Sequence, residues 1–373
     1  MNIPSYSSTL KFLVVSALLA TACAPAVAKR YVNERIEVAF VIDTTGSMAN
    51  LIEGAKRKIW SIANTIVDIN PNADIRMALV AYRDYGDKYV VKTFDMSADI
   101  QGLYGNLIGF QAFGGGDIPE AVNEALNASV HEVNWSRDRE THRMIFLVGD
   151  APPHMDYDNG PKYPEVIRFA RTAGITIHAV QAGNSNQTRN IWKDIAYRGA
   201  GDYISIPQDG GQITVIETPY DNDIIVLQRR IDKTVIPFGN EKTKSGLLNK
   251  LERKLLAAPS VAIENSKFYS KRSVRKEVVT GSGDIVSAIR NKDIALDAIK
   301  RDELPRQLQS MNKTERRKYI NEKIAERSAL EEKMAKLVKK HDAYTLKENE
   351  KLAKTKPADS FDKAVSRAIT KNF

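Results

Sequence analysis

The chain has 373 residues, and at about 100–200 residues per domain this length predicts two domains. Hydrophobic residues make up 43%, an ordinary share for a soluble protein, and the single cysteine excludes a disulfide scaffold. The net charge of +9 is unevenly placed. Residues 1–220 contain 20 Lys and Arg against 24 Asp and Glu, whereas residues 221–373 contain 35 against 22. This asymmetry predicts a boundary near residue 220 and a basic C-terminal half.

The N-terminal residues have the features of an export signal. Lys11 gives a positive start, and residues 12–22 (FLVVSALLATA) form an apolar run that is too short to span a bilayer. A small-x-small site ends at Ala28, so we expect cleavage there and an exported protein, periplasmic or secreted. The alternative is a lipoprotein anchored through Cys23, and an uncleaved anchor is a third reading.

Residues 35–206 alternate between strand and helix patterns. Residues 35–42 (RIEVAFVI) and 144–148 (MIFLV) are continuous apolar runs, as strands covered on both faces require. Residues 51–69 show apolar side chains at helical spacing and end before Pro71. This alternation predicts an α/β fold, a doubly wound and mostly parallel sheet with helices on both faces. The other predicted strands are 75–82, 89–94, 175–181 and 203–206, and the other predicted helices are 98–108, 118–131, 162–173 and 186–198.

After residue 207 the pattern changes. Residues 224–231 predict a helix, and residues 240–300 give only a mixed pattern. Asn312 and Glu315 form a capping box for a long helix that reaches about residue 350. Its irregular apolar stripe favours docking on this same chain, with a coiled coil or partner helix as the alternative. The stripe consists of Ile320, Ile324, Leu330, Met334, Leu337 and Val338.

These patterns predict a signal peptide at 1–28, an α/β domain at 33–210, a mixed connecting region at 211–300 and a helical basic tail at 301–373. A basic region in an exported protein suggests an anionic envelope surface or an acidic partner. Nucleic acid is not expected as a partner outside the cytoplasm. The sequence does not indicate an oligomeric state.

Polar side chains follow two of the predicted strands, 35–42 and 144–148. In open α/β sheets, ligands bind beyond the C-terminal ends of the strands. Asp43, Thr45 and Ser47 alternate along the loop after the first strand, and Asp150 follows the strand at 144–148. Tracing the chain direction places the loop 113–117 (FGGGD) at the same edge. Oxygen ligands of this kind suit Mg²⁺, which prefers octahedral coordination at about 2.0–2.1 Å and retains several waters.

The run VIDTTGSM at 41–48 resembles the Asp-x-Ser/Thr-x-Ser signature of von Willebrand factor type A domains, and Asp150 matches the downstream aspartate of that family. The resemblance covers about residues 35–207. Many members have a threonine in the middle loop, where this chain has Gly116 followed by Asp117. The run GGGDIPEA is most similar to the branch found beside atypical alpha-kinases and in bacterial exported proteins. The tail lacks kinase motifs, so the kinase association does not transfer.

The resemblance implies a metal-ion-dependent adhesion site that holds Mg²⁺, or Mn²⁺ or Ca²⁺ in its place. The implied ligands are Asp43, Thr45, Ser47, Asp117 and Asp150. An open coordination position would accept an acidic residue of a protein partner. The alternative interpretation of Asp43 and Ser47 is helix capping, which does not explain why Asp117 and Asp150 reach the same edge.

Other polar residues near this edge have two interpretations. Arg83, Asp84 and Asp87 on the hairpin are either ligand-reading groups or a solvated turn. A histidine without a Ser or Cys partner, such as His154, is more often incidental than catalytic. Three further residues are expected in the core, namely His178, Tyr82 and Trp60.

Three classes of function remain. The first is a metal-dependent protein-binding module of the cell envelope that is not an enzyme. The second is a structural envelope protein that acts through its basic helical tail. The third is a hydrolase that uses either the metal or His154. Against it, the sequence contains no Gly-x-Ser-x-Gly elbow and no His-Glu-x-x-His motif.

Overall fold

The computed structural model describes residues 34–116, 118–209, 216–272, 275–353 and 361–371. The expected cleavage site and Cys23 lie outside these residues, as does Asp117, so export, lipidation and the role of Asp117 stay predictions. Within the described part, no helix combines the length and the apolar composition that crossing a bilayer would need.

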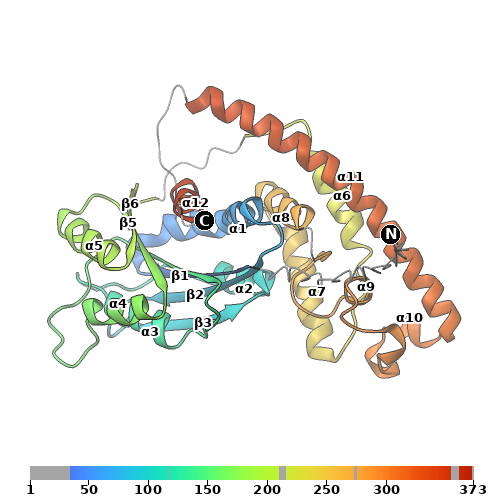
Figure 1. The fold of residues 1–373 in the computed structure, drawn as a ribbon, viewed down its shortest axis with the longest axis horizontal. Helices are drawn as coiled ribbons and strands as arrows, with labels where there is room; N and C mark the ends of the chain where they lie inside the picture. Colours follow the sequence, from blue (N-terminus) through green and yellow to red (C-terminus); the bar gives the residue numbers. More distant parts are fainter. Residues whose placement is uncertain (1–33, 117, 210–215, 273–274, 354–360, 372–373) are drawn as a thin grey trace, which may run out of the picture. The chain divides into compact units, whose positions relative to one another are not determined.

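The centre of the fold is a six-stranded sheet with the order β3-β2-β1-β4-β5-β6 (Figure 1). Every neighbouring pair is parallel except β2 with the edge strand β3. The predicted mostly parallel sheet is therefore confirmed. Its strands are β1 Arg35–Asp43, β2 Asp74–Tyr82, β3 Val91–Ser97, β4 Thr141–Gly149, β5 Ile175–Ala182 and β6 Ala200–Ile206.

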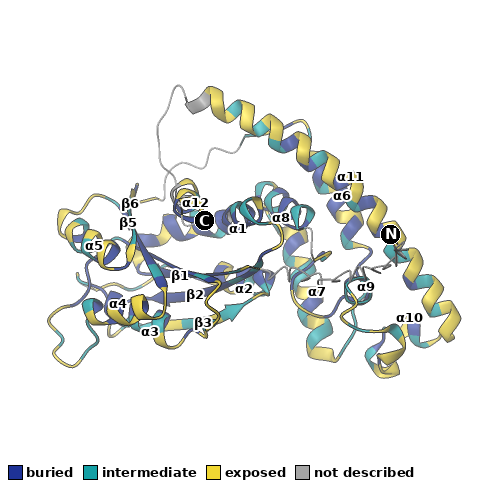
Figure 2. Ribbon diagram, in the orientation of Figure 1, coloured by how far each residue is buried: buried dark blue, intermediate teal, exposed yellow. Residues whose placement is uncertain are grey.

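Helices cover both faces of the sheet, whose four central strands are largely buried, whereas the edge strands β3 and β6 are mostly intermediate (Figure 2). Successive side chains of a strand point to opposite faces. Val38 and Phe40 of β1 therefore pack with α1 and α2, whereas Ala39 and Val41 pack with α3, α4 and α5. The helices are α1 Ala49–Ile69, α2 Ile100–Ile108, α3 Val122–His131, α4 Tyr163–Thr172 and α5 Asn186–Arg198.

The core on the α1 side also contains residues from far along the chain. Helices α8 (Pro259–Lys271) and α12 (Phe361–Lys371) both pack on α1. The rings of Phe268 on α8 and Trp60 are in a tilted contact with their centroids 5.4 Å apart, and Val365 and Ile369 of α12 are fully buried in the same cluster. The hydrophobic core therefore continues across the boundary that the sequence predicts at residue 210.

The remaining helices form a largely helical region after residue 216. The segment 240–300, which gave only a mixed pattern, contains α7, α8 and α9. Two features explain this: α7 is strongly polar, and α9 has only 6 residues. The bounds are α6 Asp221–Asp232, α7 Glu241–Leu256, α9 Ile285–Arg290, α10 Arg306–Gln309 and α11 Lys313–Ala353.

The long helix α11 begins at the predicted capping box. The Asn312 N–H donates to Glu315 Oε2 at 2.9 Å, and the Glu315 N–H donates to Asn312 Oδ1 at 3.0 Å. Leu330, Met334 and Val338 are buried against α6 and α8. The stripe thus docks on this same chain, the interpretation that the sequence favours, while a coiled coil stays untested.

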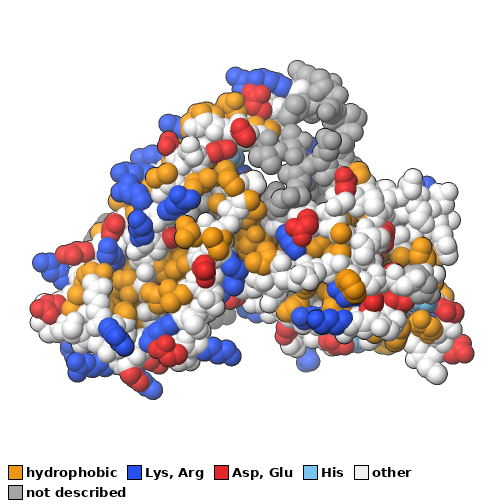
Figure 3. Space-filling model, turned by 180° about the vertical axis from the view of Figure 1, so that it is seen from behind, with side chains coloured by type: hydrophobic (Ala, Val, Ile, Leu, Met, Phe, Trp, Pro, Cys, Tyr) orange, Lys and Arg blue, Asp and Glu red, His pale blue; other side chains and the backbone are white. Residues whose placement is uncertain are grey.

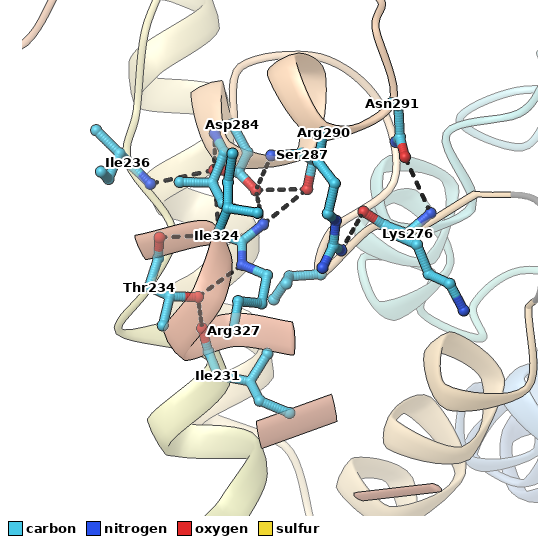
Figure 4. Close-up of polar contacts among 12 residues, drawn as sticks. Ile231, Thr234, Ile236, Lys276, Asp284, Ser287, Arg290, Asn291, Ile324 and Arg327 are labelled. Atoms are coloured by element: carbon cyan, nitrogen blue, oxygen red, sulfur yellow. Dashed lines mark hydrogen bonds and ion pairs between the residues drawn. The ribbon is translucent and has the colours of Figure 1, made fainter. Parts of the chain in front are cut away.

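A buried ion pair joins α11 to the start of α9 (Figure 4). The Arg327 side chain is fully buried and its Nη1 lies 2.6 Å from Asp284 Oδ2. Arg327 Nε donates to Thr234 Oγ1 at 2.7 Å and Nη2 donates to the Thr234 carbonyl at 2.8 Å. Asp284 also caps α9 by accepting from the N–H groups of Val286 and Ser287. One guanidinium therefore holds three segments of the helical region together.

His178 on β5 lies in the core, as expected, with no exposed surface. Its ring stacks on Phe146 at a centroid distance of 4.8 Å, and its Nδ1 accepts the Asp202 N–H at 3.1 Å. That bond requires a lone pair on Nδ1, and burial lowers the pKa of His178 to about 4. The folded protein therefore keeps this imidazole neutral.

We expect stability to fall as the pH decreases from about 6.5 to about 4. In this window the unfolded chain binds a proton at His178 and the folded chain does not. The contribution of His178 to the free energy of unfolding is therefore complete above pH 6.5 and is lost as the pH falls toward 4. A shift of this size corresponds to about 3 kcal/mol. Urea unfolding at a series of pH values should show the decline, and His178→Gln should flatten it. His131→Gln, on the surface of α3, is the control, and an unchanged slope in His178→Gln would contradict the assignment.

Candidate metal centre at the edge of the sheet

Two loops at the C-terminal edge of the sheet are joined by backbone hydrogen bonds. The Gly46 N–H donates to the Gly114 carbonyl at 3.1 Å, and the Phe113 N–H donates to the Thr44 carbonyl at 3.1 Å. The first loop follows β1 and the second follows α2. The expected approach of these loops is therefore present in the structure.

The loop after β4 reaches the same place. Gln208 Nε2 donates to Asp150 Oδ2 at 2.6 Å and to the Ser47 carbonyl at 3.4 Å. β1 and β4 are adjacent strands between which the chain order reverses. Because ligands of open α/β sheets bind at such a switch point, the structure places Asp150 and the first loop where a ligand site is expected.

The carboxyl group of Asp43 is fully buried, and only one of its two oxygens accepts hydrogen bonds. Its Oδ1 accepts from the Thr45 N–H at 2.8 Å and from Thr45 Oγ1 at 2.7 Å, and Thr45 Oγ1 lies 3.4 Å from the exposed Ser47 Oγ. Asp43 Oδ2 has no hydrogen-bond partner among the described residues. Met48 is the N-cap of α1 and provides no side-chain bond, so helix capping does not explain Asp43 or Ser47.

Tyr82 and Gly149 form the floor beneath Asp43. The Tyr82 hydroxyl donates to the Val148 carbonyl at 3.4 Å, and Tyr82 is fully buried, as expected of a core residue. A Cβ atom at Gly149 would collide with this hydroxyl and would lie 3.2 Å from the Cβ of Asp43. Gly149 is therefore required for the close approach of β4 to the end of β1.

Glu120 is a member of this site that the sequence reasoning did not select. Its side chain is buried, and its Oε2 has no hydrogen-bond partner among the described residues. A Cβ atom at Gly115 would lie 2.9 Å from Glu120 Oε1 and 3.0 Å from the Cβ of Thr45, so Glu120 reaches the first loop. The sequence feature that could have indicated Glu120 is the run GGGDIPEA, in which Glu120 follows Asp117 by three positions.

The sequence of residues 37–218 matches the family model described as the von Willebrand factor A domain. Residues 37–218 are a von Willebrand factor A domain. This confirms the family expected from the motif at 41–48. The helical region that follows lies outside the match.

Among curated proteins, a protein of Acanthamoeba polyphaga mimivirus named for an ariadne-like RING finger, R811, is 30% identical over 119 residues. The match covers 32% of this chain and 11% of that relative, so the chain spans only about a tenth of the relative's length.

Solved structures with a similar fold include BatB of Bacteroides thetaiotaomicron, at 16% identity, a TM-score of 0.34, and coverage of 46% of this chain and 90% of that chain. The VWA domain of SpRpn10 matches at 14% identity with a TM-score of 0.36, covering 48% of this chain and 89% of that one. Proximal thread matrix protein 1 of the mussel byssus matches at 16% identity with a TM-score of 0.34, covering 48% of this chain and 43% of that chain.

Carboxyl groups are concentrated at this edge of the A domain. Burial raises the pKa of Asp43 to about 7, although hydrogen bonds from Thr45 act in the opposite direction. Burial, and then the charges of Asp43, Asp84 and Asp150, raise the pKa of Glu120 to about 9. A cation at this edge would lower these pKa values and so favour the charged carboxylates.

Arg83 and Asp84, at the start of the hairpin at this edge of the A domain, are buried, so the interpretation as a solvated turn is wrong for these two residues. The Arg83 guanidinium donates to the Gln111 carbonyl at 2.8 Å and lies over the Tyr89 ring. Asp87 accepts from the Gly115 N–H at 3.1 Å and so supports the middle loop.

His154 is a buried part of this polar network. Its Nε2 lies 3.3 Å from Asp84 Oδ1, its Nδ1 lies 2.9 Å from Asp156 Oδ1, and its ring stacks on Tyr157. Both ring nitrogens therefore contact carboxylates. The ring connects the loop after β4 to the hairpin after β2.

The side-chain oxygens at this edge of the A domain are of the kind that a small hard cation binds. The described members are carboxylate and hydroxyl oxygens, and Mg²⁺ selects such oxygens. Adjacent ligands of octahedral Mg²⁺ lie about 3 Å apart, close to the separations of the Asp43, Thr45 and Ser47 oxygens. Among the described residues no group of three or more His, Cys, Asp or Glu forms a metal-binding cluster. A cation here would therefore depend on hydroxyl oxygens as well as carboxylates.

Proposed function

We propose that this chain is an exported protein-binding module whose A domain requires a divalent cation, Mg²⁺ or in its place Mn²⁺ or Ca²⁺. The observation that carries the proposal is the buried and unpartnered Oδ2 of Asp43, next to the hydroxyls of Thr45 and Ser47. Leaving a buried carboxylate oxygen without a partner is costly, and a cation would remove that cost.

Asp43, Thr45, Ser47 and Asp150 would hold the cation, with Asp117 as the predicted ligand from the middle loop. When bound, the ion would offer an open position to an acidic side chain of a protein partner. Exposed apolar side chains lie in the middle loop, with Phe113 at 72% and Ile118 at 73% exposure. These two side chains would contact the partner around its acidic residue.

Binding, and not catalysis, is the activity that we assign to the site. A hydrolase would need a group that is poised to take a proton from water or substrate. His154 instead has Asp84 and Asp156 on its two ring nitrogens. The same arrangement gives it a positioning role between two loops.

The alternative function is a structural envelope protein that binds anionic surface through the basic region 221–373. The charges of α11 are partly balanced within the helix by pairs such as Lys336–Glu332 and Lys323–Glu326. Lysine, arginine and acidic side chains are interspersed over the helical region on the face shown in Figure 3. This mixture favours a solvated surface over a dedicated anion-binding face.

The test uses the mature full chain as bait on envelope extract, because the core of the A domain includes α8 and α12. We expect retention of a protein partner to be lost with chelator, restored by Mg²⁺ and only moderately reduced by salt. Binding through the basic region would ignore chelator and fall steeply with salt, since the Debye length is about 10 Å at 0.1 M. If the only retention observed is insensitive to chelator and falls steeply with salt, the proposal is contradicted and the structural alternative is favoured.

A further inference from the structure

A cavity of about 480 Å³ lies at the N-terminal edge of the sheet, opposite to the edge that carries the candidate metal centre. Arg35 and Asp74, the first residues of β1 and β2, line it from the A domain together with Arg76. Arg272 and Arg275, in the segment that follows α8, line it from the helical region. Clefts that hold small molecules usually measure about 300–1,000 Å³, so this cavity is large enough for one.

The two arginines of the A domain share one carboxylate of this lining. Arg35 Nε donates to Asp74 Oδ2 at 2.8 Å, and Arg76 Nη2 lies 3.2 Å from the same oxygen. Arg35 Nη1 also donates to Ser136 Oγ at 3.1 Å. Both arginine side chains are partly exposed. Asp74 therefore fixes the positions of two guanidinium groups on the cavity wall and balances the charge of only one.

Arg272 has the fewest hydrogen bonds of the arginines in the lining. Its side chain is only 11% exposed, and its Nη1 lies 3.7 Å from Glu277 Oε2, beyond hydrogen-bond distance. Its Cζ lies over the Phe268 ring, 5.4 Å from the centroid, and within the described residues its guanidinium donates no hydrogen bond. None of its nitrogens is among the fully buried atoms that lack a partner, so they are open to the cavity that Arg272 lines. An acceptor in this cavity would therefore be favoured.

The charged groups of the lining leave a positive excess. Four arginines are present against two carboxylates, those of Asp74 and Glu277. Arg275 Nη1 lies 3.7 Å from Glu277 Oε1 and 3.2 Å from Asp293 Oδ2, so Asp293, just outside the lining, offsets part of this excess. The wall therefore keeps one to two positive charges that no carboxylate balances.

We propose that this cavity binds a phosphate monoester. The Arg272 guanidinium donates to the phosphate oxygens, while Arg35, Arg76 and Arg275 supply positive charge around them. A phosphate monoester carries about 1.5 to 2 negative charges at pH 7, which matches the excess on the wall. The planar fork of a guanidinium group also suits two phosphate oxygens at once. This site lies outside the proposed function, because it is formed by other residues than the metal centre.

The test measures the binding of glycerol 3-phosphate to the full chain by calorimetry. Chelator is present throughout, so that phosphate held by a metal ion does not contribute. We expect saturable binding, and sodium acetate at the same ionic strength should bind more weakly because it carries one charge. A second arm uses sedimentation with phosphatidylcholine vesicles that contain phosphatidic acid. Binding in the first arm identifies a soluble ester as the ligand, and binding in the second arm alone identifies a lipid headgroup.

Arg272→Gln should weaken binding in the responding arm by about tenfold or more, the loss expected for hydrogen bonds to a charged group. Arg317→Gln on α11 makes the same change of charge far from the lining, and it should bind as the wild type does. If Arg272→Gln fails to fold, Arg76→Gln at a partly exposed position serves in its place and should also weaken binding. Absence of binding in both arms, or equal weakening in the cavity variant and in Arg317→Gln, would overturn the proposal.

Discussion

Asp43→Ala should abolish magnesium binding and leave the A domain folded. The carboxylate is fully buried at the end of β1, and burial raises its pKa to about 7, so it is kept at a cost to folding. Asp43→Ala removes Oδ2, the oxygen without a hydrogen-bond partner among the described residues. The apolar side chains of β1 keep their packing. Stability in chelator should therefore be equal to that of the wild type or greater, as at other sites where function opposes stability.

Calorimetry on the mature chain would measure the loss of magnesium binding, and thermal unfolding in chelator would measure the fold. Asp158→Ala, exposed on the loop after β4, is the control and should bind magnesium normally. Thr45→Val removes only the hydroxyl that bonds Asp43, and it should weaken magnesium binding as well. Undiminished binding in Asp43→Ala would exclude this edge as the cation site.

Arg327→Ala should destabilise the helical region by about 3–5 kcal/mol, because it leaves the buried Asp284 carboxylate without its cation. Thr234 loses two bonds in the same change. Urea unfolding, followed by circular dichroism, would show the loss as a lower midpoint. Such a loss is a large part of the stability of an ordinary domain.

Arg317→Ala on the same helix is the matched control. Arg317 also pairs with an aspartate, Asp297, but the Arg317 side chain is 62% exposed, so its loss should cost less than about 1 kcal/mol. The double variant Arg327→Met with Asp284→Asn removes both charges and should recover part of the stability. Equal effects of Arg327→Ala and Arg317→Ala would show that burial does not determine the strength of this pair.

The sheet could be predicted from the sequence because its central strands are continuous apolar runs with helical patterns between them. β1 and β4 are nearly fully buried, and a strand covered on both faces has no other pattern. Residues 240–300 gave no such signal. The helices of this segment pack on α1, α2 and α11, which are distant in the sequence, so no local pattern indicates which of their faces are buried.

The site could be predicted only in part for a related reason. Asp43 is the last residue of β1, and Thr45 and Asp150 lie within two residues of a strand end, so topology alone places them at one edge. Glu120 reaches the first loop through a connection that also bonds the Pro152 carbonyl and the His154 N–H. Arg83 is buried by the rings of Tyr89 and Phe113. These positions depend on tertiary contacts between loops, which no local pattern encodes.

The docking of α12 on α1 has a consequence for the order in which the protein can fold. The hydroxyl of Thr65 on α1 is hydrogen-bonded to that of Ser366 on α12 across 301 positions of sequence, and Lys371 pairs with Asp202 on β6. A ribosome completes α1 long before it makes α12, so the face of α1 that packs on α12 stays uncovered until α12 has been made. Contacts of such long range slow folding and expose aggregation-prone surface. The export that we propose would benefit from this delay, because α1 is fully covered only after α12 has been made.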